Sequence, residues 1–423
     1  MQKILLIFKI PDLRKKILAV AFLLVVFRVF AAIPIPSVDP VRLKEFLSSS
    51  QIFGFINIFA GGGFDNLSIV MLGLGPYITA TIIMQLLTII SPKLKSFYYE
   101  EGAEGRIKFN RISRYLTVPL AAFQAYGFLN LLISQQVLPP LSFSETLANV
   151  VVITAGSIFL MWIGELISEY KIGNGISLII FAGIVSSIPQ VVASAIATYT
   201  PEVISTYFAF AILAVFVVAG VVFVNEGERK IPISYAKQVR GMKLYGGVSS
   251  YLPLKVNQAG VIPIIFAISV LLFPQFIAQM TAIFSQSLSI RLNEILNSLF
   301  NNVFVYSFVY FILVVLFTYF YTAVTFDPKE IAKTLQRSGA FIPGTRPGQS
   351  TAEVIGRVVY RTTFFGAIFL GIVAILPNIT QLITGVQILT IGGTALLIVV
   401  AVALEIMKQI ESQLTVREYE GIL

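Results

Sequence analysis

Long apolar segments, separated by short polar stretches, run through the whole chain. Ten of them are 15 to 23 residues long, close to the length of about 20 residues that an α-helix needs to cross a bilayer core. We therefore predict an all-α integral membrane protein with ten transmembrane helices. The predicted spans are residues 17–33, 76–90, 116–138, 147–167, 176–192, 204–224, 260–277, 303–325, 362–376 and 389–407.

The stretch Phe53–Leu87 is apolar enough for a membrane, but glycine, proline and polar residues interrupt it. Pro76 lacks an amide donor and clashes with the preceding turn, so we expect a new helix to begin there. The piece before it, roughly Asp65–Leu74, would be about 15 Å long as a helix, half of a bilayer core. Broken backbone at this depth is stable only inside protein or beside a water-filled cavity. The pattern favours a half-helix folded into a cavity, or else two ordinary spans with a glycine-rich loop between them.

Composition supports a membrane protein and excludes several kinds of chemistry. Hydrophobic residues make up 57% of the chain, charged residues 12%, and the mean hydropathy is +0.87, outside the range of soluble domains. The chain has no Cys and no His, which excludes disulfides, thiolate chemistry and His-ligated metals. It also lacks HExxH, GxSxG and a glycine-rich loop between a strand and a helix. We expect no enzymatic activity, no metal and no cofactor.

Positive charge is divided unequally between alternate connections. Of the 30 Lys and Arg residues, 26 lie in the connections on the side of the N-terminus, three lie in the other set, and Arg28 lies inside span one. This is a strong positive-inside signal, so both termini are predicted to be cytoplasmic. The net charge of +9 is therefore explained by topology rather than by nucleic-acid binding.

Ten spans divide into an N-terminal half, residues 17–192, and a C-terminal half, residues 193–407. An odd number of spans in each half means that a repeated second half would be inverted in the membrane. The basic segment 1–16 is expected to be an amphipathic helix at the cytoplasmic interface, and residues 408–423 a cytoplasmic tail. Inverted halves with a broken helix indicate a pathway between them, which leaves two classes, a secondary transporter or a protein-conducting channel.

Two features favour the channel. The span interiors contain almost none of the ionisable residues that coupled transporters use near the midplane. The predicted cytoplasmic loops 225–258 and 326–361 are long and carry six basic residues each, so they are candidate docking arms for a soluble partner, with contact to anionic lipid as the alternative. Lys230–Ala236 has the pattern of a strand, and a turn at Gly241 would complete a hairpin.

Five segments, found in order along the chain, resemble the bacterial SecY family, the channel subunits of the Sec protein translocon. They are Asn57–Leu87, Lys171–Val185, Pro253–Ala267, Ser338–Gly348 and Gly392–Val400. The resemblance implies ten helices in two inverted halves around an hourglass pore, which a re-entrant half-helix plugs at residues 61–74. It also implies release of hydrophobic segments sideways into lipid through a lateral gate.

The resemblance assigns roles to individual residues. An aliphatic pore ring is implied at Leu74, Ile78, Ile176, Ile180, Ile265 and Ile398. The plug is implied at Gly61, Gly62, Gly63, Phe64, Asp65 and Asn66, and the lateral gate at Thr81, Gln85, Gln124, Asn257 and Ser269. Docking of a motor or ribosome is implied at Arg240, Lys243 and Arg346. Without the resemblance, the same isoleucines would be ordinary packing residues and the same polar groups would be contacts between packed spans.

The partners that the resemblance implies are the membrane subunits SecE and SecG, the SecA motor ATPase and the ribosome. Precursor proteins with signal sequences would be the substrates, and the bilayer of the inner membrane would be the surroundings. No specific nucleic-acid sequence is expected to be bound.

Overall fold

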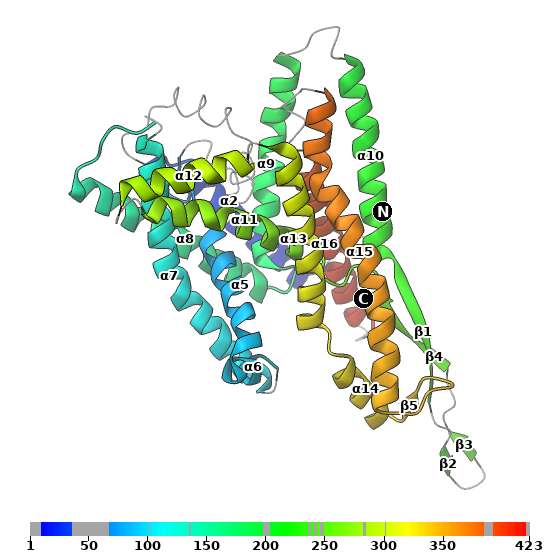
Figure 1. Cartoon of the computed structure of the whole chain (residues 1–423). Helices are drawn as coiled ribbons and strands as arrows, with labels where there is room; N and C mark the ends of the chain where they lie inside the picture. Colours follow the sequence, from blue (N-terminus) through cyan, green and yellow to red (C-terminus); the bar gives the residue numbers. More distant parts are fainter. Residues whose placement is uncertain are drawn as a thin grey trace.

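The computed structural model describes residues 10–35, 67–99, 101–134, 137–197, 204–235, 238–240, 243–245, 249–281, 285–300, 302–384 and 392–419. Within these residues the protein is mostly helical, with a small sheet at one end (Figure 1). The helices are α2 (Pro11–Ala31), α5 (Gly75–Ile90), α6 (Pro92–Tyr99), α7 (Gly102–Ser134), α8 (Phe143–Glu169), α9 (Gly175–Ala197), α10 (Ile204–Glu226), α11 (Ile262–Thr281), α12 (Gln286–Phe300), α13 (Val303–Thr325), α14 (Pro328–Arg337), α15 (Gln349–Thr384) and α16 (Gly392–Tyr419).

Helices α2, α5, α7 to α11, α13, α15 and α16 overlap the ten predicted spans, but fewer of them are clear membrane spans by length and composition. Among the described residues, five helices meet that standard, and two others are apolar but shorter, Gly175–Pro189 and Ile262–Gln275. The five are Glu104–Ile133, Phe143–Glu169, Phe208–Glu226, Val303–Arg337 and Gln349–Thr380. One reason is visible in α5, which has only 16 residues, short for the roughly 20 that a straight span needs.

The predicted new helix at Pro76 is confirmed, because α5 begins at Gly75 with proline in its first turn. The predicted half-helix is wrong over the part that the structure describes. Residues 67–74 form consecutive turns, with the amides of Met71, Gly73 and Gly75 bonded to carbonyls three residues earlier. Glycine at positions 73 and 75 and the left-handed φ of Gly73, 55°, favour tight turns over an α-helix. The plug residues 61–66 lie outside the described residues.

The two predicted docking arms form one small subdomain. Strand β1 (Glu228–Tyr235) pairs antiparallel with β4 (Ser249–Lys255), and β2 (Gln238–Arg240) pairs with β3 (Lys243–Tyr245) further along the hairpin. The predicted hairpin is thus confirmed. The second arm adds β5 (Ala340–Phe341) to the other edge of β1, which gives the strand order β4-β1-β5.

A separate cluster of buried apolar residues holds this subdomain together, and we call it the arm core. It comprises Ile231, Leu254, Ile342, Ile355 and Val359. Helix α14 contributes its apolar side, while Asp327 caps its N-terminus by accepting a 2.8 Å hydrogen bond from the amide of Lys329. The second arm is shorter than predicted, because residues 349–361 already belong to α15.

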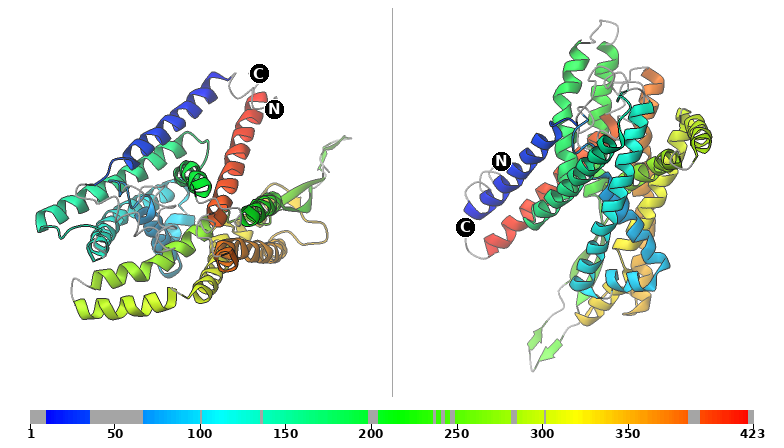
Figure 2. Two further views of the ribbon diagram at one scale, coloured as in Figure 1. Left: turned by 90° about the horizontal axis from the view of Figure 1, so that it is seen from above. Right: turned by 90° about the vertical axis from the view of Figure 1, so that its left-hand side faces the viewer.

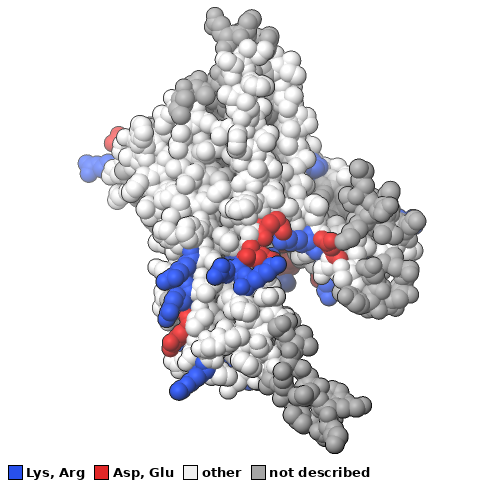
Figure 3. Space-filling view, turned by 90° about the vertical axis from the view of Figure 1, so that its right-hand side faces the viewer, with Lys and Arg blue, Asp and Glu red and all other residues white. Residues whose placement is uncertain are grey.

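Secondary structure and charge both distinguish the two ends of the molecule. The β-strands, α14 and α6 lie at one end in Figure 1. The C-terminal end of α9 and the N-terminal end of α10 lie at the opposite end. On the face drawn in Figure 3, charged side chains gather in the lower half, and the upper half is nearly free of them. Viewed from above, α2 and α8 lie side by side on one flank and α11 and α12 on the other, with α5 between the two pairs (Figure 2).

Candidate functional site

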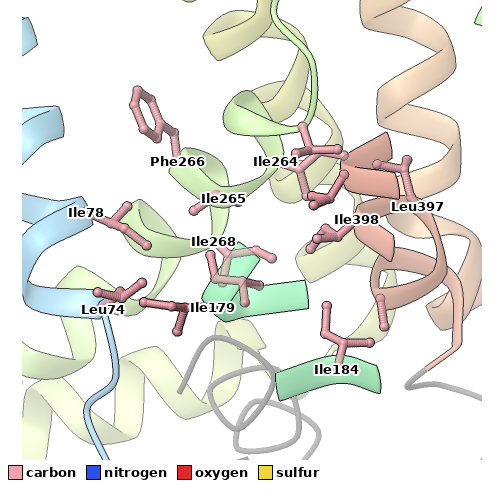
Figure 4. Close-up of a cluster of buried hydrophobic side chains, with 14 of the residues drawn as sticks. Leu74, Ile78, Ile179, Ile184, Ile264, Ile265, Phe266, Ile268, Leu397 and Ile398 are labelled. Atoms are coloured by element: carbon pink, nitrogen blue, oxygen red, sulfur yellow. The ribbon is translucent and has the colours of Figure 1, made fainter. Parts of the chain in front are cut away.

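The largest buried cluster brings the predicted ring residues together from four helices. Leu74, Ile78, Ile180, Ile265 and Ile398 are all at most 5% exposed and belong to this one cluster. The sixth predicted residue, Ile176, is partly buried and packs against it. Figure 4 shows side chains of α5, α9, α11 and α16 around a common centre. We call the six residues the aliphatic ring.

The ring is built where helices begin. Leu74 immediately precedes α5, and the other ring residues lie within the first two turns of their helices. On α9 this position is fixed by Asn174, whose side-chain Oδ1 accepts hydrogen bonds from the amides of Ile176 (3.0 Å) and Ser177 (3.4 Å). Such a cap satisfies amides that have no partner inside the helix. Each ring residue therefore follows a break in the backbone.

Gly175 allows the turn before α9 to approach α8 closely. A Cβ atom at this position would lie 1.8 Å from the carbonyl oxygen of Gly164, so only glycine fits. The amide of Gly175 also donates a 2.9 Å hydrogen bond to the hydroxyl of Ser168. These contacts hold the first two turns of α9, with Ile176 and Ile180, in the centre of the molecule.

The chemistry of the ring is entirely apolar. Its six side chains are all Leu or Ile, so they offer no hydrogen bond to an ion or to a passing polar group. Hydrophobic constrictions of this kind block ions by excluding water. Ile264 and Ile268 on α11 and Leu397 on α16 belong to the same cluster, and sequence reasoning missed them because each is an ordinary apolar residue in an apolar helix.

The predicted gate residues do not form one hydrogen-bonded group. Thr81 and Ser269 each donate to a carbonyl one turn earlier in their own helices, at 2.9 Å. Gln85 and Gln124 are 7% exposed, on α5 and α7, which pack against each other and against α11. Asn257 lies elsewhere, beside a cavity between α9, α10 and α16.

The predicted docking residues lie on the arm subdomain. Arg346 is exposed in a turn flanked by Gly344 and Gly348, both with left-handed φ, and its carbonyl accepts a 2.9 Å bond from the Thr351 hydroxyl. Arg240 and Lys243 are register partners in the β2–β3 hairpin. Sequence reasoning missed that β5 joins the arms; Gly339, with a φ of 69°, is the one local signal before that two-residue strand.

Metal binding has no support in the part of the chain that the structure describes, where no group of three or more Asp or Glu side chains could hold an ion. The charged groups instead pair with one another. Arg114 on α7 contacts Glu165 on α8 at 2.5 Å, and Lys408 on α16 contacts Glu226 on α10 at 2.9 Å.

Sequence comparisons identify close relatives over the full chain. A family model described as SecY matches residues 68–407. The protein translocase subunit SecY of Thermus thermophilus is 44% identical, with 98% of this chain and 96% of that protein covered. The corresponding subunit of Corynebacterium glutamicum is 42% identical, with both chains fully covered.

Solved structures agree on the fold. A structure described as a protein conducting channel covers 93% of this chain and 90% of its own, with a TM-score of 0.64 and 21% identity. The channel in a canine ribosome-channel complex from the endoplasmic reticulum gives a TM-score of 0.62 at 20% identity, with the same coverage.

Proposed function

The chain belongs to the SecY family, the protein-conducting channels of the Sec translocon, and we propose that its aliphatic ring is the constriction through which precursor chains pass. Membership of this family decides against the alternative hypothesis of a secondary transporter. The family function is that of a channel subunit and not of an enzyme. The observation that carries the proposal is the convergence of six Leu and Ile side chains at the beginnings of four helices, five of them in one buried cluster and Ile176 packed against it.

The finer architecture is part of the proposal. Ten helices in two inverted halves, residues 17–192 and 193–407, would enclose the pore, and residues 61–74 would plug it from outside. In this arrangement α5, which has only 16 residues, crosses the membrane together with the turns that precede it. An aliphatic ring suits an unfolded chain of any sequence, because it can widen around the chain without binding one side chain tightly.

Sideways release would use α5, α7, α11 and α13, which correspond to spans two, three, seven and eight, as the lateral gate. Thr81 and Ser269 bond only within their own helices, so opening the gate would not require breaking those two bonds. A signal sequence with about ten Leu-like residues gains roughly 3–6 kcal/mol on entering lipid, whereas a charged residue costs about 2.5–3.5 kcal/mol. Interhelical hydrogen bonds in membranes are worth about 0.6–2 kcal/mol each, so a hydrophobic segment could open this gate and a polar one could not.

The chain is a multi-pass membrane protein, and we infer that the arm subdomain and both termini face the cytoplasm of the cell that makes it. Arg240, Lys243 and Arg346 would receive the SecA motor or the ribosome, since a channel of the same fold occurs in a ribosome-channel complex. SecE and SecG would bind in the membrane. Helix α10 offers surface for lipid or such subunits. Only 6% of its apolar segment is buried within the chain, whereas 50% of the apolar segment of α8 is buried.

Crosslinking to a stalled precursor tests the ring. The chain has no cysteine, so single cysteines at Ile78, Ile180 and Ile398 report contact without background. We expect all three to crosslink to the same short stretch of the precursor, and cysteine at the lipid-facing Ile372, which is 47% exposed, to give none. Crosslinks at Ile372 equal to those at the ring would refute the assignment.

Cysteine labelling of intact cells tests the topology. Cysteines at Lys243 and Arg346 should be protected from a membrane-impermeant reagent, whereas cysteine at the exposed Arg291 on α12 should react. The expectation follows from the 26 basic residues on one side and the positive-inside rule. Labelling at Arg346 from outside would remove both the orientation and the docking role of the arms.

A further inference from the structure

A cavity of about 400 Å³, lined by both polar and apolar residues, lies next to the aliphatic ring. Its walls come from the start of α9, the end of α10, the segment between β4 and α11, and the middle of α16. Amide and hydroxyl side chains predominate among its polar groups, namely Asn174, Ser177, Asn225, Asn257, Gln258 and Gln409. The volume falls within the range of about 300–1,000 Å³ that is typical of binding pockets.

The sequence positions of the walls show where the cavity lies relative to the ring. Ser177 is three residues before the ring residue Ile180, and Ile262 is three residues before Ile265. Ala401 is three residues after Ile398. Three residues correspond to about 4.5 Å along a helix, so the cavity lies close to Ile180, Ile265 and Ile398, and Ser177 directly follows the ring residue Ile176. Glu226 and Lys255, at the bases of β1 and β4, also line it, so it is on the side of the ring that faces the arms.

The charged groups of the cavity are balanced. Lys408 pairs with Glu226 at 2.9 Å, and Glu405 interacts electrostatically with Lys255 and with the backbone amide of Asn174. Two acidic and two basic residues therefore offset each other within the protein. This arrangement selects neither an anion such as phosphate nor a cation, and a neutral polar ligand fits it best.

Asn257 leaves one hydrogen-bonding position open. Its Nδ2 donates to Asn225 Oδ1 at 2.8 Å and to the carbonyl of Gly260 at 3.1 Å. Its Oδ1 is buried without a partner among the described residues, and the residue is only 6% exposed. Buried acceptors are almost always paired in folded proteins, so this atom calls for a donor, and Asn257 is one of the residues that line the cavity.

We propose that the cavity is a subsite for the peptide backbone of a chain about to pass the ring, with Asn257 Oδ1 as the acceptor for a backbone N–H. This inference rests on the ring proposed above. Every residue except proline carries one backbone donor and one acceptor, so a site made of amides binds an extended chain whatever its side chains are. Such a subsite holds the chain in line with the ring without selecting its sequence.

Paired single cysteines in the assembled membrane complex test the subsite. Gln258→Cys, half-buried in the cavity wall, reports the cavity, and Ile180→Cys reports the ring. A precursor stalled in transit carries one cysteine that is moved along its sequence. We expect disulfides to Gln258→Cys from precursor positions a few residues behind those that reach Ile180→Cys. Asn257→Leu should lower the cavity crosslink about two- to tenfold, the loss expected for one neutral hydrogen bond, and leave the ring crosslink unchanged.

A matched control is available at Asn378, which is fully buried, donates to Ser307 Oγ at 3.1 Å and also has an unpartnered Oδ1, but does not line the cavity. Asn378→Leu should leave the cavity crosslink unchanged. Asn257→Asp keeps the acceptor while breaking the bonds to Asn225 and Gly260, so its crosslink should stay within about twofold of the original, well short of losing one hydrogen bond.

Three outcomes would overturn the proposal. They are ring crosslinks without cavity crosslinks, an equal loss in Asn378→Leu, and a loss in Asn257→Asp as large as in Asn257→Leu, which would mean that Asn257 acts only through its structural bonds. Loss of crosslinks at Ile180→Cys as well as Gln258→Cys would instead remove the ring on which the inference rests.

Discussion

The aliphatic ring and the arm core have nearly the same composition but are held together differently. The ring consists of Leu and Ile side chains, and the arm core consists of buried Leu, Ile and Val side chains. The arm core is framed by backbone hydrogen bonds, since β1 is paired with β4 from Glu228↔Lys255 to Ser234↔Ser249 and with β5 on its other edge. The ring is formed by side chains from four separate helices, each of which satisfies its own backbone.

This difference determines how each region can move. Widening the ring separates side chains but breaks no backbone hydrogen bond, so the cost is limited to packing. Separating the arms would break a strand ladder and expose its unpaired groups. The arms are therefore expected to move as one body with the start of α15, while the ring changes its width.

The largest effect is expected from a substitution that creates a cavity in the arm core. Ile355 is fully buried there, and Ile355→Ala should destabilise the subdomain by about 2–5 kcal/mol. Hydrogen exchange of the β1 and β4 amides should accelerate accordingly, while amides of α5 beside the ring should keep their protection. Tyr251→Ala, at a residue of β4 that is 62% exposed, should change exchange by less than about 0.5 kcal/mol. Equal acceleration in β1 and α5 would mean that the two cores unfold as one.

A polar substitution in the ring should act on opening rather than on folding. Ile398 is 1% exposed, and in Ile398→Asn the amide would lack a partner in the closed state, at a cost of about 1–3 kcal/mol. Water satisfies the same amide in the open state, so the open population should rise by up to roughly a hundredfold. Ion conductance of the idle channel should increase, and precursors with defective signal sequences should be exported better.

Ile372→Asn is the control for this experiment, because Ile372 lies on α15 and is 47% exposed. It should change neither conductance nor signal-sequence dependence. Equal effects at Ile372 and Ile398 would mean that a polar residue anywhere in these helices loosens the channel, and the distinction between ring and surrounding packing would be lost.

The six ring residues were assigned through the resemblance to the SecY family, and the sequence around them also marks where the helices begin. Glycine or proline precedes each ring residue, as at Gly75-Pro76 before Ile78 and at Gly175 before Ile176. The motifs that resemble the SecY family include these breaks. Within each motif, the residue that determines the backbone conformation, such as Gly175, lies close in sequence to the ring residue.

The union of the arms could not be predicted in the same way. Tyr235 and Ala340 are register partners although more than a hundred residues separate them, and a two-residue strand is too short to carry an alternating pattern.

The start of the helix in span nine was also predicted too late. The hydropathy pattern placed the start of that span at residue 362, whereas α15 already begins at Gln349. Glu353, Arg357 and Arg361 in that first part lower the hydropathy but not the tendency to form a helix, so the apolar length measures the membrane environment and not the helix.

The smallest expected effect concerns the surface of the arms. Arg346 is exposed, so Arg346→Glu should leave the arm core and the ring intact and act only at the partner surface. Exposed charge pairs are worth about 0.2–1 kcal/mol, which predicts motor-driven export slowed by up to about fivefold. Since surface charges are screened over about 8 Å at physiological salt, raising the salt concentration should weaken docking to the original protein and narrow the difference from the variant.

Arg291→Glu provides the matched charge reversal, because Arg291 is exposed on α12, in the set of connections that is predicted to face away from the motor. It should leave export and its salt dependence unchanged. If Arg346→Glu and Arg291→Glu slow export equally, the effect is one of net charge on membrane insertion or assembly. If neither does, Arg346 is not part of the docking surface, and the arm subdomain must receive its partner through other residues, although its rigidity as one body would be unaffected.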